Sequence, residues 1–228
     1  MLREIKPSNN VNIVSFTGGE PTLHPQLSEI LKIVSHAGYS FGLVTNGWHF
    51  SDTYHVLLQY KSMLKGVTFS LDGAREETHD NLRGKGSYRR VMQAVSVCVV
   101  KDIPFTFNTT VTSYNCDELQ EVAEFATKLG SRGLRFGHLM PTPLTAKYTL
   151  DLSPEKRREV ETTVTQLQGP FPLRIAMAPR DYIAPNTLCA PLRMEEFNID
   201  WRGNLTLCCN LSGYGDGEKD GNIVARGD

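Results

Sequence analysis

The segment TGGEPTLHP at residues 17–25 directly follows the apolar run IVSF at residues 13–16. Glycine has no Cβ, so Gly18 and Gly19 allow the backbone to approach a ligand closely. Glu20 adds a carboxylate to the same turn, and Pro21 fixes its own φ and stiffens the chain. We therefore expect a strand that ends in a pocket for a ligand with an ammonium group. An ordinary strand-to-helix turn has a similar composition and is the alternative.

The composition is that of an ordinary globular protein: 228 residues, 40% hydrophobic and 21% charged. A net charge of −1 gives no electrostatic reason to expect nucleic acid as a partner. No stretch approaches the roughly 18 consecutive apolar residues of a membrane span. The first residues lack the apolar core of a signal peptide. We expect a cytoplasmic protein, and its five cysteines, an odd number, argue against a secreted disulfide framework.

Short β-rich runs alternate with helical patterns along most of the chain. We expect strands at residues 11–16, 41–44, 66–69, 104–111 and 133–140. We expect helices at residues 25–37, 52–60, 88–100, 115–129 and 153–167, and a polar loop at residues 74–86. Asn115, with Glu118 three residues later, resembles a capping box at the start of the fourth helix. Serial strand–helix units predict an α/β fold with a parallel sheet. Open doubly wound sheets and (β/α) barrels both fit, and both bind ligands at the carboxyl ends of their strands.

Polar residues and glycines gather at these strand ends. The second strand ends in Thr45-Asn46-Gly47, and the third is followed by Ser70 and Asp72. Residues two apart share one face of a strand, so this hydroxyl and carboxylate form a suitable clamp for the vicinal hydroxyls of a ribose. The alternative is that both residues only cap the following loop.

With these strand ends in this order, the chain resembles the radical S-adenosylmethionine (radical SAM) enzymes. The resemblance rests on residues 16–25, 43–47 and 69–73, and residues 78–88 are typical of the subgroup with a C-terminal SPASM or twitch auxiliary iron–sulfur domain. It implies a (β/α)6 barrel, bound S-adenosylmethionine (AdoMet) and [4Fe–4S] clusters. It also implies a flavodoxin- or ferredoxin-type electron donor.

The resemblance implies a set of cofactor-binding residues at the strand ends: Gly18, Gly19, Glu20, Pro21, Thr45, Asn46, Ser70, Asp72, Asn108 and Leu139. In this interpretation Glu20 binds the ammonium group of the methionine moiety, and Ser70 and Asp72 contact the ribose. Leu139 would face the adenine. His24, His79 and His138 are acid–base candidates, although His24 fits better as a helix start and His79 as a residue that orders its loop.

The chain departs from the family pattern before the first motif. The family holds its catalytic cluster with a CxxxCxxC loop after the first strand, but no cysteine precedes Gly18. We therefore expect a partial barrel that lacks its first strand and cluster loop. Cys98 fits a small core residue, and Cys116 a packed or surface thiol. The interpretation is a chain truncated at both ends, or else a non-catalytic relative.

A β-hairpin is predicted near the C-terminus, with strands at 197–201 and 204–208. Thirteen residues separate Cys189 from Gly203, and four separate Gly203 from Cys208. This spacing resembles the C-x(9–15)-G-x4-C opening of a SPASM or twitch domain. Thiolates suit iron–sulfur clusters, so Cys189, Cys208 and Cys209 are the candidate metal ligands. Ordinary buried thiols and a zinc site are the alternatives.

These interpretations divide the chain into a partial barrel (1–150), a helical or extended linker (151–185) and a partial auxiliary domain (186–228). The expected function is that of a radical SAM enzyme fragment, in which a 5′-deoxyadenosyl radical abstracts hydrogen from a peptide or protein. One alternative is a step in cofactor biosynthesis, such as tetrapyrrole side-chain chemistry. Another is a non-catalytic module that binds AdoMet or a peptide.

Overall fold

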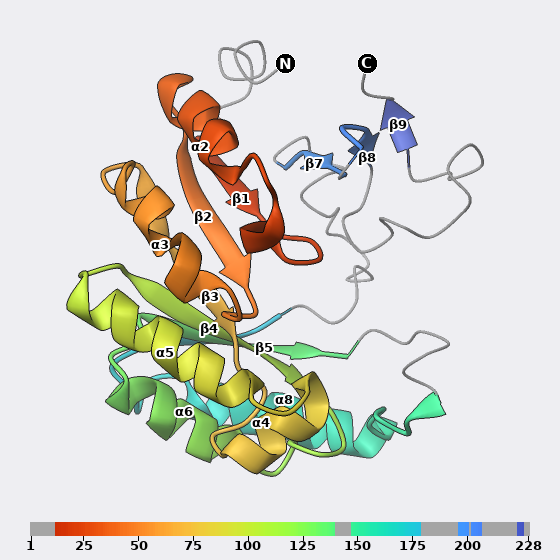
Figure 1. Cartoon of the computed structure of the whole chain (residues 1–228). Helices are drawn as coiled ribbons and strands as arrows, with labels where there is room; N and C mark the ends of the chain where they lie inside the picture. The colour runs from red at the N-terminus through yellow and green to blue at the C-terminus, as the bar shows by residue number, and fades with distance from the viewer. Residues whose placement is uncertain (1–11, 140–146, 179–195, 201, 207–222, 226–228) are drawn as a thin grey trace. The chain divides into compact units, whose positions relative to one another are not determined.

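The computed structural model describes residues 12–139, 147–178, 196–200, 202–206 and 223–225. The chain divides into two compact units, one of residues 13–180 and one of residues 1–12 with 181–228. The first contains a six-stranded parallel sheet and the second a three-stranded antiparallel sheet (Figure 1). Cys189, Cys208 and Cys209 lie outside the described residues, so their predicted role as metal ligands stays a prediction.

The parallel sheet has the order β1-β2-β3-β4-β5-β6. Its strands are β1 (Ile13–Phe16), β2 (Ser40–Thr45), β3 (Leu64–Ser70), β4 (Phe105–Val111), β5 (Gly133–His138) and β6 (Arg174–Met177). The connecting helices are η1 (Pro21–Leu23), α2 (Leu27–His36), α3 (Phe50–Leu58), α4 (Glu76–Arg83), α5 (Ser87–Val100), α6 (Leu119–Lys128) and α8 (Pro154–Leu167). Neighbouring strands are therefore consecutive in the chain, as in a barrel.

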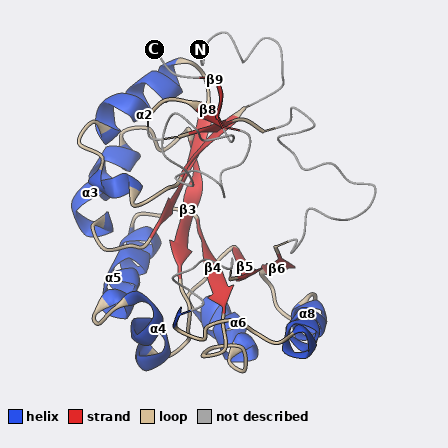
Figure 2. Cartoon of the chain, turned by 90° about the vertical axis from the view of Figure 1, so that its right-hand side faces the viewer, coloured by secondary structure: helices blue, strands red, loops and turns tan. Residues whose placement is uncertain are grey.

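The described helices cover only one face of this sheet (Figure 2). Burial alternates along β4 for the same reason: Phe105 and Phe107 are buried against the helices, whereas Thr106 and Asn108 are only half-buried. We call the side of Thr106 and Asn108 the open face of the sheet. A doubly wound sheet would carry helices on both faces, so the partial (β/α) barrel is confirmed.

Aromatic side chains form the core between the sheet and its helices. Phe41, Phe69, Phe107 and Phe136, one from each of β2 to β5, are 0% exposed. Phe50 at the start of α3 packs edge-on against Phe69, with 5.2 Å between the ring centroids. This layer fixes the strands, and with them the loops at their carboxyl ends.

Besides η1 and a short strand at Ile223–Ala225, two elements lie where the sequence predicted none. Helix α4 occupies part of the predicted polar loop 74–86, and β6 pairs with β5 inside the interval predicted as a linker. Helix α6 also begins at Leu119, because Asn115 does not form the predicted capping box. Among the described residues, no helix is both long and apolar enough to cross a lipid bilayer.

The smaller unit contains β7 (Asn198–Ile199), β8 (Leu205–Thr206) and β9 (Ile223–Ala225). β7 and β8 pair antiparallel, which confirms the predicted hairpin. The turn between them is closed by Asp200, whose carboxylate accepts hydrogen bonds from Arg202 N at 2.9 Å and from Asn204 N at 2.8 Å.

Candidate cofactor site at the strand ends

The carboxylate of Glu20 joins the ends of β1 and β2. Its Oε1 accepts hydrogen bonds from Thr22 N at 3.1 Å, Thr22 Oγ1 at 2.6 Å and Thr45 Oγ1 at 2.7 Å. Its Oε2 accepts one from Asn46 N at 2.8 Å. The side chain therefore caps η1 and holds the loop after β2 in place. Three residues that the sequence assigned to one pocket (Glu20, Thr45 and Asn46) are brought together here.

The backbone beside this carboxylate is open. A Cβ added to Gly18 or Gly19 would meet no other heavy atom within 4 Å. Gly18 also has φ +123°, a conformation that side-chain-bearing residues rarely adopt. Both glycines are exposed, so their backbone borders free space next to Glu20.

Thr45 and Asn46 shape the end of β2. The Thr45 hydroxyl oxygen, which donates to Glu20, accepts a 3.0 Å hydrogen bond from Gly47 N. The Asn46 side chain is exposed, and its Oδ1 accepts from Trp48 N at 2.9 Å. Thr45 is thereby fixed as a support for Glu20, whereas the side-chain nitrogen Nδ2 of Asn46 borders solvent.

Ser70 and Asn108 lie opposite each other on the open face. They are register partners in β3 and β4, and both are half-buried. Within the described part of the chain, neither side chain is engaged in a hydrogen bond, so both are available to a ligand. One row nearer the amino ends, the hydroxyls of Thr68 and Thr106 lie 2.9 Å apart and bond to each other.

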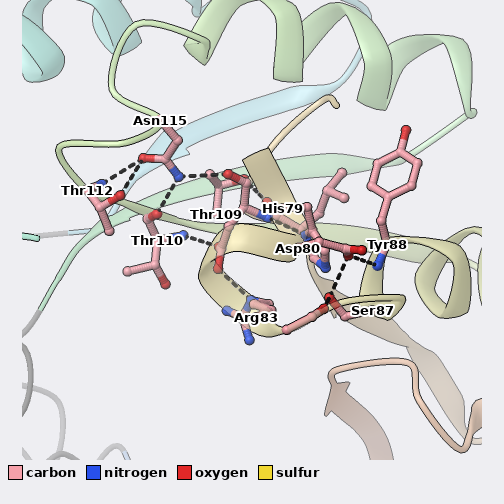
Figure 3. A network of polar contacts seen from close by, with 12 residues as sticks. His79, Asp80, Arg83, Ser87, Tyr88, Thr109, Thr110, Thr112 and Asn115 are labelled. Carbon is pink, nitrogen blue, oxygen red and sulfur yellow. Dashed lines mark hydrogen bonds and ion pairs between the residues drawn. The ribbon is translucent and has the colours of Figure 1, made fainter. Parts of the chain in front are cut away.

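Asp72, by contrast, is buried in a polar network. Figure 3 labels its partners Arg83, Thr110, His79 and Asn115. Its Oδ2 accepts from Arg83 Nε at 2.5 Å, and its Oδ1 accepts from Thr110 N at 2.8 Å. These contacts tie the loop after β3 to α4 and to the end of β4. The side chain of Asp72 is only 5% exposed. Its predicted ribose contact stays a prediction, and the structure adds an anchoring role.

The backbone of Asp72 is held from two further sides. Its N–H donates to His79 Nδ1 at 3.1 Å, and its carbonyl accepts from Asn115 Nδ2 at 2.8 Å (Figure 3). Asn115 also accepts from Thr112 N at 2.7 Å and donates to Thr110 O at 2.9 Å. The sequence predicted only a helix cap at Asn115. Its bond to Asp72 joins positions 43 apart in the chain, so local spacing could not reveal it.

His79 is 0% exposed, and burial lowers its pKa from 6.5 to about 4, with nearby Asp72 opposing and Arg83 reinforcing the shift. Since Nδ1 accepts a hydrogen bond, the neutral ring carries its proton on Nε2. Among the residues that the structure describes, that nitrogen has no hydrogen-bond partner, and the ring packs edge-on against Tyr88 with 5.9 Å between the ring centroids. The contacts agree with the expectation that His79 orders its loop.

The other two histidines have structural contacts of their own. His24 is exposed, and its Nδ1 accepts from Gln26 N at 3.1 Å just before α2. His138 Nε2 lies 3.0 Å from Glu161 Oε1 on α8, on the helix-covered side of β5. Leu139 follows β5 and is half-buried, so its predicted contact with adenine stays a prediction.

No group of three or more metal-ligating side chains occurs among the described residues. Cys98 is 0% exposed inside α5, and burial raises the pKa of its thiol to about 12. Cys116 is half-buried, and burial raises its pKa as well. The described residues therefore do not fit an iron–sulfur cluster, and Cys98 is confirmed as a core residue.

A family model for the radical SAM superfamily matches residues 1–126, more than half of the chain. The chain belongs to the radical SAM superfamily. Among its relatives is the AdoMet-dependent heme synthase of Methanosarcina barkeri, 34% identical over 131 residues that cover 57% of this chain and 37% of that protein. The PqqA peptide cyclase of Ruegeria pomeroyi is 30% identical over 119 residues, covering 52% of this chain and 32% of that protein.

Solved radical SAM structures share the fold. Streptococcus suis SuiB bound to S-adenosylmethionine superposes with a TM-score of 0.68 at 15% identity, covering 90% of this chain and 51% of SuiB. SuiB bound to its precursor peptide SuiA gives 0.66 at 14% identity, covering 90% of this chain and 50% of SuiB. The chain spans about half the length of this structure, and less than half of the two curated relatives above.

Proposed function

We propose that this chain is the AdoMet-binding part of a radical SAM enzyme that abstracts hydrogen from a peptide or protein substrate. One observation carries the proposal: Glu20 unites the ends of β1 and β2 beside the open backbone of Gly18 and Gly19. An enzyme of this family needs a site for the amino acid half of AdoMet, and this arrangement supports one.

The hydrogen-bond capacity of Glu20 fits the ammonium group of AdoMet. A carboxylate offers about four acceptor positions. Oε1 already accepts from Thr22 and Thr45, whereas Asn46 N is the only donor to Oε2 within the described ranges of the chain. Oε2 therefore retains capacity for an ammonium N–H, and a charge-assisted bond there is stronger than one between neutral groups.

The remaining pocket residues would orient the nucleoside. Ser70 and Asn108 supply polar side chains from the open face, and Asp72 holds the loop after Ser70. AdoMet, when bound and reduced by one electron, supplies a carbon radical that abstracts hydrogen. The protein contributes binding, orientation and exclusion of water. The cluster ligands, and the flavodoxin- or ferredoxin-type donor that the family resemblance implies, belong to the proposal for the whole enzyme.

A peptide substrate is supported by two of the similar proteins. One relative is a PqqA peptide cyclase, and SuiB has been crystallised with its precursor peptide. A second candidate function, modification of a tetrapyrrole during cofactor biosynthesis, is favoured by 34% identity to a heme synthase. Both functions use the same AdoMet site and differ in the group that lies against the open face.

The test is AdoMet binding by Glu20→Gln, measured by isothermal titration calorimetry. Gln keeps the size of the side chain but removes its charge, so we expect about tenfold weaker binding. Glu29→Gln is the matched control, because Glu29 lies exposed in the first turn of α2. Equal AdoMet affinity in wild type and Glu20→Gln would contradict the proposed site.

A further inference from the structure

Two arginines from neighbouring strands lie on the open face of the sheet. Arg135 on β5 is in register with Asn108 on β4 and with Ala176 on β6. Arg174 on β6 is in register with Gly133 on β5. Register partners in a parallel sheet share a face, and residues two apart on a strand do so as well. Both arginines therefore project from the face to which Asn108 belongs.

The space above Gly133 confirms this placement. A Cβ added to Gly133 would lie 3.5 Å from Thr106 Cγ2 and 3.9 Å from Arg174 Cβ. Thr106 and Arg174 thus flank the same side of Gly133. An added Cβ would also lie 3.2 Å from Arg174 O, so the strands approach closely at this glycine. Gly133 and Gly137 therefore add no side chains on either side of Arg135 on the same face.

The two charges are not neutralised by the sheet. Both arginines are exposed, and neither makes an ion pair or a side-chain hydrogen bond within the described part of the chain. The open-face positions of β3 to β6 include no carboxylate; they are Gly66, Thr68, Ser70, Thr106, Asn108, Thr110, Gly133, Arg135, Gly137, Arg174 and Ala176. On the helical side, in contrast, Arg75 pairs with Glu121 and Arg89 pairs with Glu76.

The spacing of the pair suits one shared ligand. Adjacent strands lie about 4.8 Å apart and a strand rises about 3.3 Å per residue, so a two-residue offset separates the Cα atoms by roughly 8 Å. Arginine side chains are long enough to converge across that distance. Guanidinium groups bind carboxylate and phosphate oxygens through paired N–H donors. An uncompensated pair of them raises the local concentration of anions.

We propose that Arg135 and Arg174 bind an anionic group, carboxylate or phosphate, of the substrate at the open face of the sheet. The proposal rests on the proposed function only in naming the ligand as the substrate. Arg135 lies level with Asn108 and Ser70, so this site adjoins the residues proposed for the nucleoside. It is distinct from the ammonium site at Glu20.

The test uses the full chain with inorganic phosphate and the dicarboxylate glutarate as separate probes. Sodium chloride holds the ionic strength constant, because screening alone weakens exposed charges. In calorimetric titrations we expect Arg135→Gln and Arg174→Gln each to weaken binding about tenfold. Arg135→Lys keeps the charge but loses the paired N–H donors, so it should weaken binding by less than Arg135→Gln without restoring the wild-type affinity. Arg132→Gln is the matched control: Arg132 precedes β5 and lines a separate hollow with Leu129.

Tighter binding of phosphate would indicate a phosphorylated substrate, and tighter binding of glutarate a carboxylate-bearing one. Either result supports the site if Arg135→Gln and Arg174→Gln weaken anion binding and Arg132→Gln does not. Equal affinity in wild type and both variants, or an equal loss in Arg132→Gln, would overturn it. Glu20→Gln separates the two proposals: we expect it to bind AdoMet about tenfold more weakly and to keep its affinity for the anion.

Discussion

The hydroxyl of Thr45 donates a 2.7 Å hydrogen bond to Oε1 of Glu20, a residue 25 positions earlier in the chain. The bond crosses from the end of β2 to the turn after β1. It holds Oε1 of the carboxylate, while Oε2 accepts a hydrogen bond from Asn46 N. Glu20 is therefore a positioned group, whose orientation depends on a neighbouring strand.

The first prediction concerns that bond. Thr45→Val keeps the shape of the side chain but removes the donor, so Glu20 loses one of the contacts that orient it. We expect a loss of about 1 kcal/mol in the free energy of unfolding by urea, and about fivefold weaker AdoMet binding. Thr53→Val is the control, because the Thr53 hydroxyl bonds only within its own helix. AdoMet affinity unchanged in Thr45→Val would show that the hydroxyl does not position Glu20.

Asn115 provides the second prediction. Asn115→Ala leaves the carbonyl oxygens of Asp72 and Thr110 and the N–H of Thr112 without their partner. Buried polar groups without partners are costly, so we expect the free energy of unfolding to fall by about 3 kcal/mol. Asn81→Ala, at an exposed position of α4, should lower the free energy of unfolding by less than about 0.5 kcal/mol. Similar losses in the two variants would refute the bridging role.

The third prediction follows from the depressed pKa of His79. The unfolded chain binds a proton near pH 6.5, whereas the folded chain does so only near pH 4. The stabilising contribution is therefore present above pH 6.5 and is lost as the pH falls towards 4. Between pH 7 and pH 5 we expect His79 to account for a loss of about 2 kcal/mol in the free energy of unfolding.

The measurement is urea unfolding at both pH values in wild type and in His79→Phe. Phe fills the buried space but does not titrate, so the variant should lose less stability between pH 7 and pH 5. His36→Phe is the control, because His36 is exposed at the end of α2 and should keep the wild-type pH dependence. An unchanged pH dependence in His79→Phe would contradict the assignment.

The fourth prediction concerns Asp80, which caps α5. Its carboxylate accepts from Gly86 N at 2.6 Å and Tyr88 N at 2.8 Å (Figure 3). Burial acts to raise the pKa of Asp80, but these bonds outweigh it, and the pKa lies below its ordinary value. Asp80→Ala should cost about 1–2 kcal/mol in urea unfolding, whereas Glu77→Ala at an exposed position of α4 should cost little. Equal stability of the two variants would argue against the cap.

The repeating part of the fold could be predicted from sequence because β2 to β5 each place apolar residues on one buried face. Helix α4 could not, because its residues are almost all polar and only His79 is buried. Hydrogen bonds hold this helix: Asp80 links its end to α5, and Arg83 links it to Asp72. β6 was missed because it has only four residues and begins with an exposed arginine.

The candidate site was predictable where neighbouring residues carry it, as in the turn of Glu20. It was not predictable where the partners are far apart in sequence. The Asn-x-x-Glu spacing at Asn115 indicated a helix cap, but a long-range bond to Asp72 determines its conformation. Arg135 also escaped notice, because one charged residue in a strand ordinarily faces solvent, and only strand register reveals its neighbours.

The central claim is that Glu20 binds the ammonium group of AdoMet. The most direct test compares AdoMet with an analogue that lacks only the α-amino group, in calorimetric titrations of wild type and Glu20→Gln. We expect the wild type to bind the analogue about tenfold more weakly than AdoMet, and Glu20→Gln to bind both with similar affinity. An equal loss of affinity for the analogue in both proteins would show that the ammonium group is bound elsewhere.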